Sequence, residues 1–401
     1  MRFLRIALFG VIPVAILLVT LYALPLSRRY SFELLGETFT QVNYGDIVPI
    51  LQILEKRWQE EPLIIQVGEK RFRVEKRALG LRWDYSSMRK SIMRNLVPLS
   101  LSLSWDEERV QKCLESLARQ TTSPPQDAVL REKRFVRAQR GKILDTTLSL
   151  PELKERLEKG ESEVTLTHFT LLPPKKDTAT LLEEHGFPYL LARYTTSLKD
   201  RDADVIFNIA KAAQTLDGLA IEKGVPFSFN QIVGKADAQD GYRKTQIVVN
   251  GRLVPGYGGG VCQVSTTLYN ALLRTEAKVL ERHPHSGYSF TTSYVPPGSD
   301  AAVSHGVKDL RFVYPSQSVV LFAYIEEENL ICEIWGEREN TLETTVETRL
   351  LEMKKQGEKE GFFTVETTVA QNGEARYRFT DTYLAPWEII EELQKKTSAP
   401  Q

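Results

Sequence analysis

The sequence predicts an α+β protein with an N-terminal transmembrane helix, two small α+β lobes, a mixed α+β domain and a short β-rich C-terminal extension. Three observations predict it: a long uncharged segment at the start, alternating segments of helical and strand-like periodicity, and proline-rich breaks between them. We expect the anchor in residues 1–29, the lobes over 30–120 and 121–190, the mixed domain over 191–336, and the extension over 337–401 with a disordered tail.

The first segment, residues 6–26, carries no charge and is long enough to cross a bilayer as one helix. A cleaved signal peptide is the alternative, but no small-x-small cleavage site precedes Ser27. We therefore expect an uncleaved signal anchor in a single-pass membrane protein. One span followed by a large body places that body outside the cytoplasm.

Charge and cysteine content narrow the functional class. The 52 lysine and arginine residues balance 52 aspartate and glutamate residues, so nothing indicates a nucleic-acid-binding protein. Three scattered cysteines are too few for a disulfide framework. Cys113 lies in a helical pattern and Cys332 in a strand pattern, which indicates small buried apolar residues. A bridge between Cys262 and Cys332 is a minor alternative.

The two lobes show a similar order of elements. In the first, strands at residues 64–67 and 72–74 flank a turn, and Asp84 precedes a helix over 86–95. In the second, a strand-like stretch, a helix and a strand are expected at 133–138, 151–159 and 163–167. The similarity indicates two related lobes rather than a repeat array.

The mixed domain is expected to begin with a core helix over residues 202–216, whose apolar residues fall on one face. A strand over 245–249 meets Asn250-Gly251, a strong hairpin signal. Short strands separated by turn residues are expected over 288–335, and a small β extension follows.

Cys262 follows a glycine cluster and opens an amphipathic helical pattern. We therefore expect its thiol in the first turn of a helix, where backbone N–H groups and the positive end of the helix dipole favour the thiolate. The N–H groups of Gly259, Gly260 and Cys262 are candidates for holding the oxyanion of a substrate carbonyl. A cysteine nucleophile requires these features.

Histidines that could serve such a nucleophile come later in the same domain. Three of the five follow Cys262: His283, His285 and His305. Near neutral pH, imidazole can activate a thiol as a base and protonate a leaving amine as an acid. Asp300 is the candidate for orienting the imidazole, with Ser286 and Asp309 as weaker candidates.

These residues also have simpler explanations. The glycine cluster before Cys262 could form a tight backbone crossing that buries an unreactive thiol. One cysteine with two or three histidines could bind zinc, although no C-x-x-C or H-E-x-x-H spacing supports a metal site. His283-Pro284-His285 could be a surface loop, and Asp300 could cap a turn.

Several segments of the mixed domain form a recognisable set: Gly258-Gly259-Gly260-Val261-Cys262-Gln263-Val264-Ser265-Thr266-Thr267-Leu268-Tyr269-Asn270, Pro226-Phe227-Ser228-Phe229-Asn230, Gly241-Tyr242, Glu281-Arg282 with His285-Ser286, and Tyr294-Val295-Pro296-Pro297-Gly298-Ser299-Asp300-Ala301-Ala302-Val303. Together they resemble the signature of the VanW domain family, over roughly residues 190–336. Residues 35–185 more loosely resemble the peptidoglycan-binding domain that often precedes VanW in membrane-anchored proteins of Gram-positive bacteria.

The resemblance implies chemistry for particular residues. VanW is named for its association with glycopeptide-resistance clusters, and some members are L,D-transpeptidases that form 3-3 cross-links in peptidoglycan with the cysteine of this motif. The family's cysteine, arginine, histidine-serine and Asp-Ala elements correspond to Cys262, Arg282, His285-Ser286 and Asp300-Ala301. Where the family commonly has Asp-Ala-Thr-Val, this chain has Ala302 in place of threonine.

The resemblance thus implies a cysteine L,D-transpeptidase of peptidoglycan stem peptides, with L,D-carboxypeptidase hydrolysis as a side activity. His285 is the first candidate for the base and His283 the second, Asp300 orients the imidazole, and Arg282 holds a substrate carboxylate. Further substrate contacts are expected from Ser286, Gln263, Gly259 and Gly260. No metal or cofactor is required. The alternative is a non-catalytic wall-binding or envelope scaffold protein linked to glycopeptide resistance.

Overall fold

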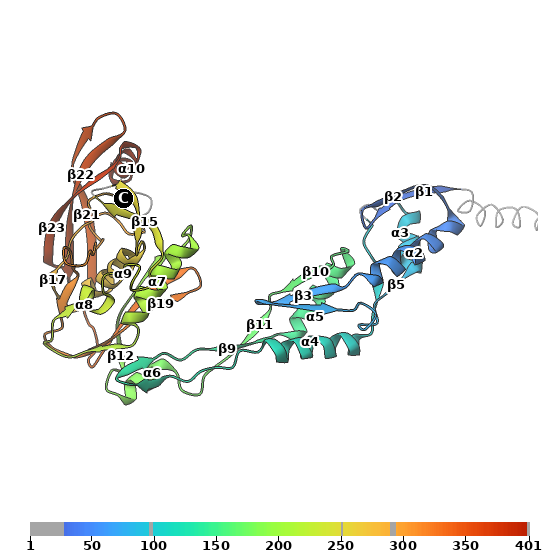
Figure 1. The fold of residues 1–401 in the computed structure, drawn as a ribbon, viewed down its shortest axis with the longest axis horizontal. Helices are drawn as coiled ribbons and strands as arrows, with labels where there is room; N and C mark the ends of the chain where they lie inside the picture. The colour runs from blue at the N-terminus through green and yellow to red at the C-terminus, as the bar shows by residue number, and fades with distance from the viewer. Residues whose placement is uncertain (1–27, 96–98, 250–251, 289–293, 399–401) are drawn as a thin grey trace, which may run out of the picture. The chain divides into compact units, whose positions relative to one another are not determined.

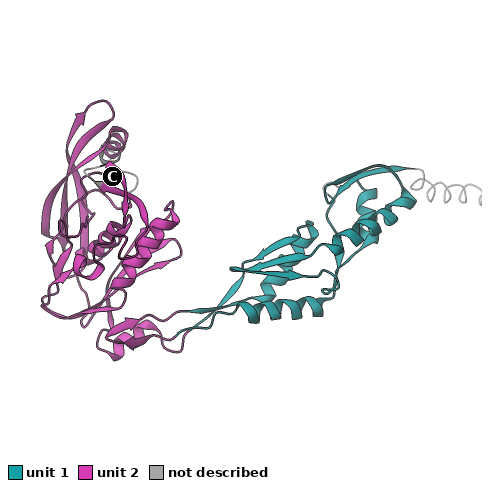
Figure 2. Cartoon of the chain, viewed as in Figure 1, with its two compact units in different colours: residues 1–126, 140–173 teal, residues 127–139, 174–401 magenta. Residues whose placement is uncertain are grey.

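The computed structural model describes residues 28–95, 99–249, 252–288 and 294–398 (Figure 1). The chain divides into two compact units, which are coloured separately in Figure 2. The first unit comprises residues 1–126 and 140–173, and the second comprises 127–139 and 174–401. Residues 121–190, which we predicted to be one lobe, therefore contribute to both units.

The first unit packs short sheets against helices. Its central sheet has the strand order β10-β3-β4, with β10 parallel and β4 antiparallel to β3. Alternate residues of β3 are buried, as expected for a strand that covers a core with one face. Its elements are β1 (Arg29–Leu34), β2 (Glu37–Asn43), η1 (Tyr44–Asp46), α2 (Ile47–Glu60), β3 (Leu63–Val67), β4 (Lys70–Val74), β5 (Arg82–Trp83), α3 (Tyr85–Met93), β6 (Leu103–Ser104), α4 (Glu107–Thr121), β9 (Gly141–Leu144), α5 (Thr146–Glu158), β10 (Glu163–Leu166) and β11 (Phe169–Leu172).

The second unit is built on an antiparallel sheet with the strand order β12-β20-β19-β13-β8-β7. Helix α7 packs against β19, and α9 packs against β12 and β20. The elements up to β20 are β7 (Val129–Arg131), β8 (Arg134–Val136), α6 (Thr178–Glu184), β12 (Tyr189–Ser197), α7 (Ala203–Leu216), β13 (Leu219–Ile221), β14 (Phe227–Ser228), α8 (Phe229–Val233), β15 (Lys244–Val249), β16 (Arg252–Tyr257), α9 (Val261–Leu273), β17 (Lys278–Glu281), β18 (Arg311–Val313), β19 (Val319–Glu326) and β20 (Asn329–Gly336).

Helix α9 is the centre of this unit. Nearly every residue from Val261 to Leu273 is buried, including Ser265, Thr266, Thr267 and Asn270. Their polar groups are satisfied locally; Thr267 Oγ1, for example, donates to the Gln263 carbonyl oxygen at 2.7 Å. A helix buried on all sides positions its first turn rigidly, and Cys262 lies in that turn.

The C-terminal extension is a three-stranded antiparallel sheet in the order β21-β22-β23. Its elements are β21 (Thr344–Gln356), β22 (Glu360–Gln371), β23 (Glu374–Pro386) and α10 (Trp387–Ser398). Helix α10 contacts all three strands. Where we predicted a disordered tail from about residue 395, α10 continues to Ser398.

The structure bears on three further predictions. Helices at 203–216 and 261–273 and the β15–β16 hairpin are confirmed, and the Asn250-Gly251 turn lies outside the described residues. All three cysteines are free, so the alternative of a Cys262–Cys332 bridge is wrong. Among the described residues no helix combines the length and apolarity needed to cross a bilayer. The predicted anchor, residues 6–26, lies outside them.

Candidate active site

The backbone before Cys262 explains the glycine cluster. Gly260 is the N-cap of α9 and has a φ of 104°, in the left-handed region that favours glycine. A Cβ atom on Gly260 would lie 2.8 Å from Cγ1 of Ile209 in α7, and one on Gly259 would lie 2.1 Å from Oγ1 of Thr245 in β15. The loop therefore runs too close to both elements to carry side chains.

A buried asparagine fixes this loop. Asn208 of α7 donates through Nδ2 to the carbonyl oxygens of Arg243 at 3.0 Å and Gly259 at 3.2 Å, and its Oδ1 accepts from the Arg243 N–H at 2.8 Å. Helix α7 thus fixes the residue before β15 and the loop before Cys262 together. Our predictions missed Asn208. Its signal in the sequence is a polar residue beside the apolar face of the 202–216 helix.

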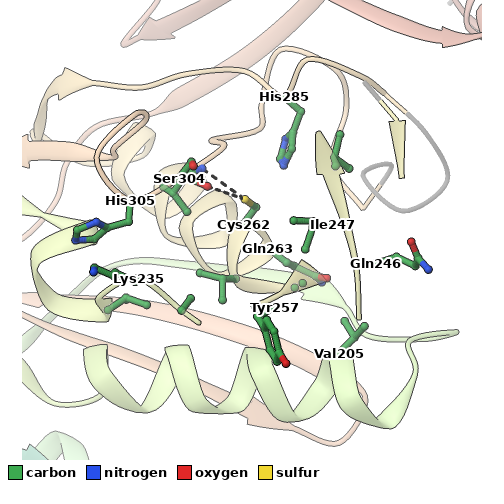
Figure 3. A pocket seen from close by; sticks show the side chains of 18 of the residues that line it. Val205, Lys235, Gln246, Ile247, Tyr257, Cys262, Gln263, His285, Ser304 and His305 are labelled. Carbon is green, nitrogen blue, oxygen red and sulfur yellow. Dashed lines mark hydrogen bonds between the residues drawn. The ribbon is translucent and has the colours of Figure 1, made fainter. Parts of the chain in front are cut away.

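Three predicted residues, Cys262, His285 and Asp300, come together. Oδ2 of Asp300 accepts hydrogen bonds from Nδ1 of His285 at 2.6 Å and from its backbone N–H at 2.7 Å. With Nδ1 held by the carboxylate, Nε2 is the ring nitrogen left for the thiol. The ring is directed toward the Cys262 sulfur in Figure 3, and each of these two side chains shifts the pKa of the other.

The electrostatics of this trio favour a thiolate paired with an imidazolium. Burial opposes the thiolate, but the hydrogen bond and charge of His285 outweigh it and lower the pKa of Cys262. Burial opposes the imidazolium, but hydrogen bonds with Asp300 and Cys262 raise the pKa of His285 to about 10. Burial opposes the Asp300 carboxylate as well, but the neighbouring His285 and Arg282 lower its pKa to about 2.

The segment after Asp300 lines the other side of the sulfur. The Val303 N–H and carbonyl oxygen each lie 3.4 Å from Cys262 Sγ (Figure 3). Ala301 is fixed to α9, because its N–H donates to Thr266 Oγ1 at 2.9 Å. Ala302, at the position that departs from the family pattern, is buried, and its N–H donates to the His283 carbonyl oxygen at 2.8 Å.

The structure brings His285, and not His283, to the thiol. Nε2 of His283 pairs with Oε1 of Glu281 at 3.0 Å, and its side chain is 37% exposed. Ser286 is also exposed, and neither residue lines the pocket over Cys262. The predicted roles of His283 as a second base and of Ser286 as a substrate contact therefore have no geometric support.

Arg282 lies behind the site rather than in it. Its side chain is 8% exposed, and it donates to Asp300 Oδ1 at 3.0 Å and to Asp381 Oδ2 at 2.5 Å. Its Nε donates to the Asp300 carbonyl oxygen at 2.6 Å. Because two buried carboxylates already hold this guanidinium, its predicted contact with a substrate carboxylate has no geometric support. Arg282 supports Asp300 instead.

A pocket of about 480 Å³ opens over Cys262 (Figure 3). The β15–β16 hairpin, the glycine loop, the start of α7 and the turn at residues 303–305 form its walls. The described residues that line it include Arg201 and Lys235, whose side chains are cationic. The Arg201 guanidinium lies 5.3 Å from the ring centroid of Tyr294, another lining residue. Among the described residues, no group of three or more His, Cys, Asp or Glu side chains is arranged to hold a metal ion.

Backbone N–H groups at the start of α9 differ in their use. Val261 donates to the Gly258 carbonyl oxygen at 3.1 Å and Gln263 to that of Gly260 at 2.9 Å. Within the described part of the chain, Gly260 and Cys262 donate no such backbone hydrogen bond.

The Gln263 side chain is hydrogen-bonded to β12, because its Nε2 donates to the Ser197 carbonyl oxygen at 2.9 Å. Its buried Oε1 has no hydrogen-bond partner among the described residues.

Asp309, a weaker candidate for orienting the imidazole, binds the Pro226–Asn230 motif instead. It accepts hydrogen bonds from Ser228 Oγ at 2.5 Å and from the Asn230 N–H at 2.9 Å. Asn230 Nδ2 in turn donates to the Lys308 carbonyl oxygen at 2.8 Å. The Pro226–Asn230 motif therefore fastens the turn that follows Val303, and Asp309 does not contact the imidazole.

The region of the chain that matches a known protein family contains this site. Residues 205–335, which contain Cys262, His285 and Asp300, match the family model described as VanW like protein. This part of the chain is a VanW-like domain. No solved structure matches the chain significantly.

Two curated relatives each match about two fifths of the chain. The uncharacterized protein YoaR of Bacillus subtilis (strain 168) is 36% identical over 153 residues, which cover 38% of this chain and 48% of YoaR. The vancomycin B-type resistance protein VanW of Enterococcus faecalis (strain ATCC 700802 / V583) is 29% identical over 172 residues, which cover 40% of this chain and 62% of that protein. The chain thus spans about half to three fifths of these relatives.

Proposed function

We propose that the VanW-like domain is a cysteine acyltransferase, an L,D-transpeptidase that forms 3-3 cross-links between peptidoglycan stem peptides. The observation that carries this proposal is the constellation of Cys262, His285 and Asp300, in which Cys262 and His285 line the pocket and the buried Asp300 holds His285 from behind. A thiol next to an imidazole that a carboxylate orients is the arrangement that acyl transfer through a thioester requires.

The first half-reaction acylates the enzyme. The Cys262 thiolate attacks the carbonyl carbon of the diamino acid at position three of a donor stem, and N–H groups of Gly260 and Cys262 hold the oxyanion. The bond to the terminal D-alanine breaks as the His285 imidazolium donates its proton to the leaving amine. A thioester at Cys262, free D-alanine and neutral His285 result.

The second half-reaction resolves the thioester. The side-chain amine of a second stem attacks the thioester carbonyl, His285 takes the proton from that amine, and the Cys262 thiolate leaves. The new amide is the 3-3 cross-link, and the imidazolium is restored. Attack by water instead of the amine releases a shortened stem, which is the L,D-carboxypeptidase outcome.

Arg201 is our assignment for the group that recognises the carboxylate of the leaving D-alanine. Its guanidinium lies in the wall of the pocket that contains Cys262, whereas that of Arg282 is held behind Asp300. A guanidinium in a partly desolvated site is well suited to binding a carboxylate.

The proposed substrate lies outside the cytoplasm. This location agrees with the predicted N-terminal anchor and with attachment of the body to the outer face of the membrane.

The test is product formation from defined stems. The full chain is incubated with a tetrapeptide-stem muropeptide, and products are separated and weighed by mass spectrometry. We expect loss of D-alanine and a 3-3 dimer from the wild type and from Cys113→Ala, and neither product from Cys262→Ala. If the folded wild type forms no dimer and releases no D-alanine with donor and acceptor stems present, the alternative of a non-catalytic wall-binding protein replaces this proposal.

A further inference from the structure

The C-terminal sheet lies beyond residues 205–335, yet it reaches the catalytic aspartate. Tyr383 of β23 is fully buried, and its hydroxyl donates to Asp300 Oδ1 at 2.6 Å. The same hydroxyl oxygen accepts from the Gly298 N–H at 2.8 Å. The two carboxylate oxygens of Asp300 therefore bind different partners. Oδ2 accepts from His285, and Oδ1 accepts from Tyr383.

A second residue of β23 holds the arginine behind Asp300. Asp381 is 6% exposed and accepts from Arg282 Nη1 at 2.5 Å, while Nη2 of the same guanidinium donates to Asp300 at 3.0 Å. The Arg282 guanidinium also lies 5.0 Å from the ring centroid of Phe379, again from β23. One strand thus supplies a hydroxyl donor to Asp300 and a carboxylate and a ring to its arginine.

The sheet also carries the two loops that hold the trio. The Tyr288 N–H donates to the Leu384 carbonyl oxygen at 2.8 Å, so β23 is hydrogen-bonded to the segment directly after His285. Gly298, two residues before Asp300, has a φ of 85°, and a Cβ atom there would lie 2.0 Å from Thr367 Oγ1 of β22. Both loops therefore lie directly against the sheet.

The far end of the Cys262 helix is fixed by the same sheet. Arg376 donates to the carbonyl oxygens of Thr275 at 2.9 Å and of Glu276 at 2.9 Å, just after α9 ends. Gln371 Nε2 donates to the Leu273 carbonyl oxygen at 3.2 Å. Val369 of β22 is fully buried in the same core cluster as α9.

We propose that the C-terminal sheet is a structural part of the active site, in which Tyr383 and Asp381 are positioning residues that hold Asp300 against His285. This inference rests on the function proposed above for the trio. Tyr383 acts by fixing Oδ1, so that Oδ2 stays directed at Nδ1 of the imidazole. Asp381 acts by sharing Arg282, which would otherwise draw Asp300 away from the imidazole.

The experiment measures how well the trio activates the thiol, with no peptidoglycan substrate present. The full chain is alkylated with iodoacetamide across a pH series, and the rate is followed by mass spectrometry on the peptide that contains Cys262. The peptide with Cys113 serves as an internal reference. Tyr383→Phe removes one hydroxyl and keeps the ring. Tyr377→Phe is the matched control, because its hydroxyl also lies on β23 but reaches Ala277 O at 3.4 Å.

We expect Tyr383→Phe to move the alkylation profile of Cys262 to higher pH and to slow alkylation at pH 7 about three- to tenfold, where a shift of one pKa unit corresponds to tenfold. Asp381→Asn should move the profile in the same direction, and Tyr377→Phe should leave it unchanged. In an Asp300→Asn background, Tyr383→Phe should add nothing, because the hydroxyl acts through Asp300.

Two results would overturn the inference: an unchanged profile in both Tyr383→Phe and Asp381→Asn, or an equal slowing by Tyr383→Phe with and without Asp300. Asp381→Asn provides the answer if Tyr383→Phe does not fold. Failure of the proposed function is seen separately. A wild type that forms no cross-link, but whose Cys262 depends on Tyr383 as described, contradicts the transpeptidase and leaves the positioning role intact.

Discussion

Asp300 holds His285 by two hydrogen bonds to one carboxylate oxygen, 2.6 Å from Nδ1 and 2.7 Å from the backbone N–H. This arrangement fixes both the tautomer of the ring and the loop that carries it. An imidazole so held presents Nε2 to Cys262 in one fixed orientation, and it retains its proton because the carboxylate is ionised.

Replacing Asp300 by asparagine tests the role of its negative charge while the shape of the side chain is kept. Asp300→Asn keeps the shape of the side chain but removes the acceptor that fixes the tautomer, and it leaves the Arg282 cation with less compensation. We expect the rate of cross-link formation to fall by about a thousandfold or more. Asp309→Asn is the control, because Asp309 fastens a neighbouring turn without touching the imidazole. Near-normal rates in Asp300→Asn would contradict the assigned role.

The pH dependence follows from the two shifted groups. The pKa of Cys262 is lowered and that of His285 is raised to about 10, so the ion pair exists between these two values. Below the lower value the thiolate is protonated, and above the upper value the imidazolium loses the proton that the leaving amine needs. We expect a bell-shaped profile of the acylation rate, with an alkaline limb near pH 10. A rate that rises steadily with pH, like that of an unassisted thiol, is the opposing result.

Asn208 should be a major determinant of stability in the second unit. Its removal in Asn208→Ala leaves the Arg243 and Gly259 carbonyl groups and the Arg243 N–H without their partner. We expect the free energy of unfolding to fall by about 2–4 kcal/mol, since buried unsatisfied groups are costly. Urea unfolding measures this, with Gln214→Ala, an exposed amide on the same helix, as the control. Equal stabilities of the two variants would show that the loop is held by other contacts.

Arg201 is expected to affect substrate binding more than the chemical step. Arg201→Ala should raise KM for the donor stem about tenfold, with a smaller change in kcat, because one charge-assisted contact is lost. Arg274→Ala is the matched control, since Arg274 also lies against a tyrosine ring, 4.6 Å from the centroid of Tyr194, but does not line the pocket. If both variants bind the donor equally well, Arg201 does not recognise the carboxylate.

Local sequence patterns predicted the parts of the site that depend on local geometry. The glycine cluster followed by helical periodicity predicted Cys262 in the first turn of an amphipathic helix. The structure confirms the helix and the position of Cys262, but α9 is buried along nearly its whole length. Apolar spacing also predicted a helix over 202–216, which the structure has at 203–216, and the Asn250-Gly251 pair predicted the hairpin that β15 and β16 form. These features follow from backbone constraints and side-chain periodicity within a few residues.

The parts that depend on contacts between distant residues could not be predicted in this way. His283 and His285 are two residues apart, and only the fold decides that the first faces Glu281 and the second faces the thiol. Arg282 was expected to hold a substrate carboxylate because it corresponds to the arginine of the family motif. One of the two carboxylates that hold it, Asp381 of β23, is 99 residues away from Arg282 in the sequence. Only the folded structure brings β23 behind Asp300.

The most direct test of the central claim is the mass of the enzyme after reaction with a donor stem when no acceptor is supplied. The account predicts a covalent adduct on Cys262 equal to the donor stem less its terminal D-alanine, sensitive to hydroxylamine and absent from Cys262→Ala. An adduct-free Cys262 in the folded wild type, under conditions where iodoacetamide does label it, would contradict the claim that this thiol carries an acyl group.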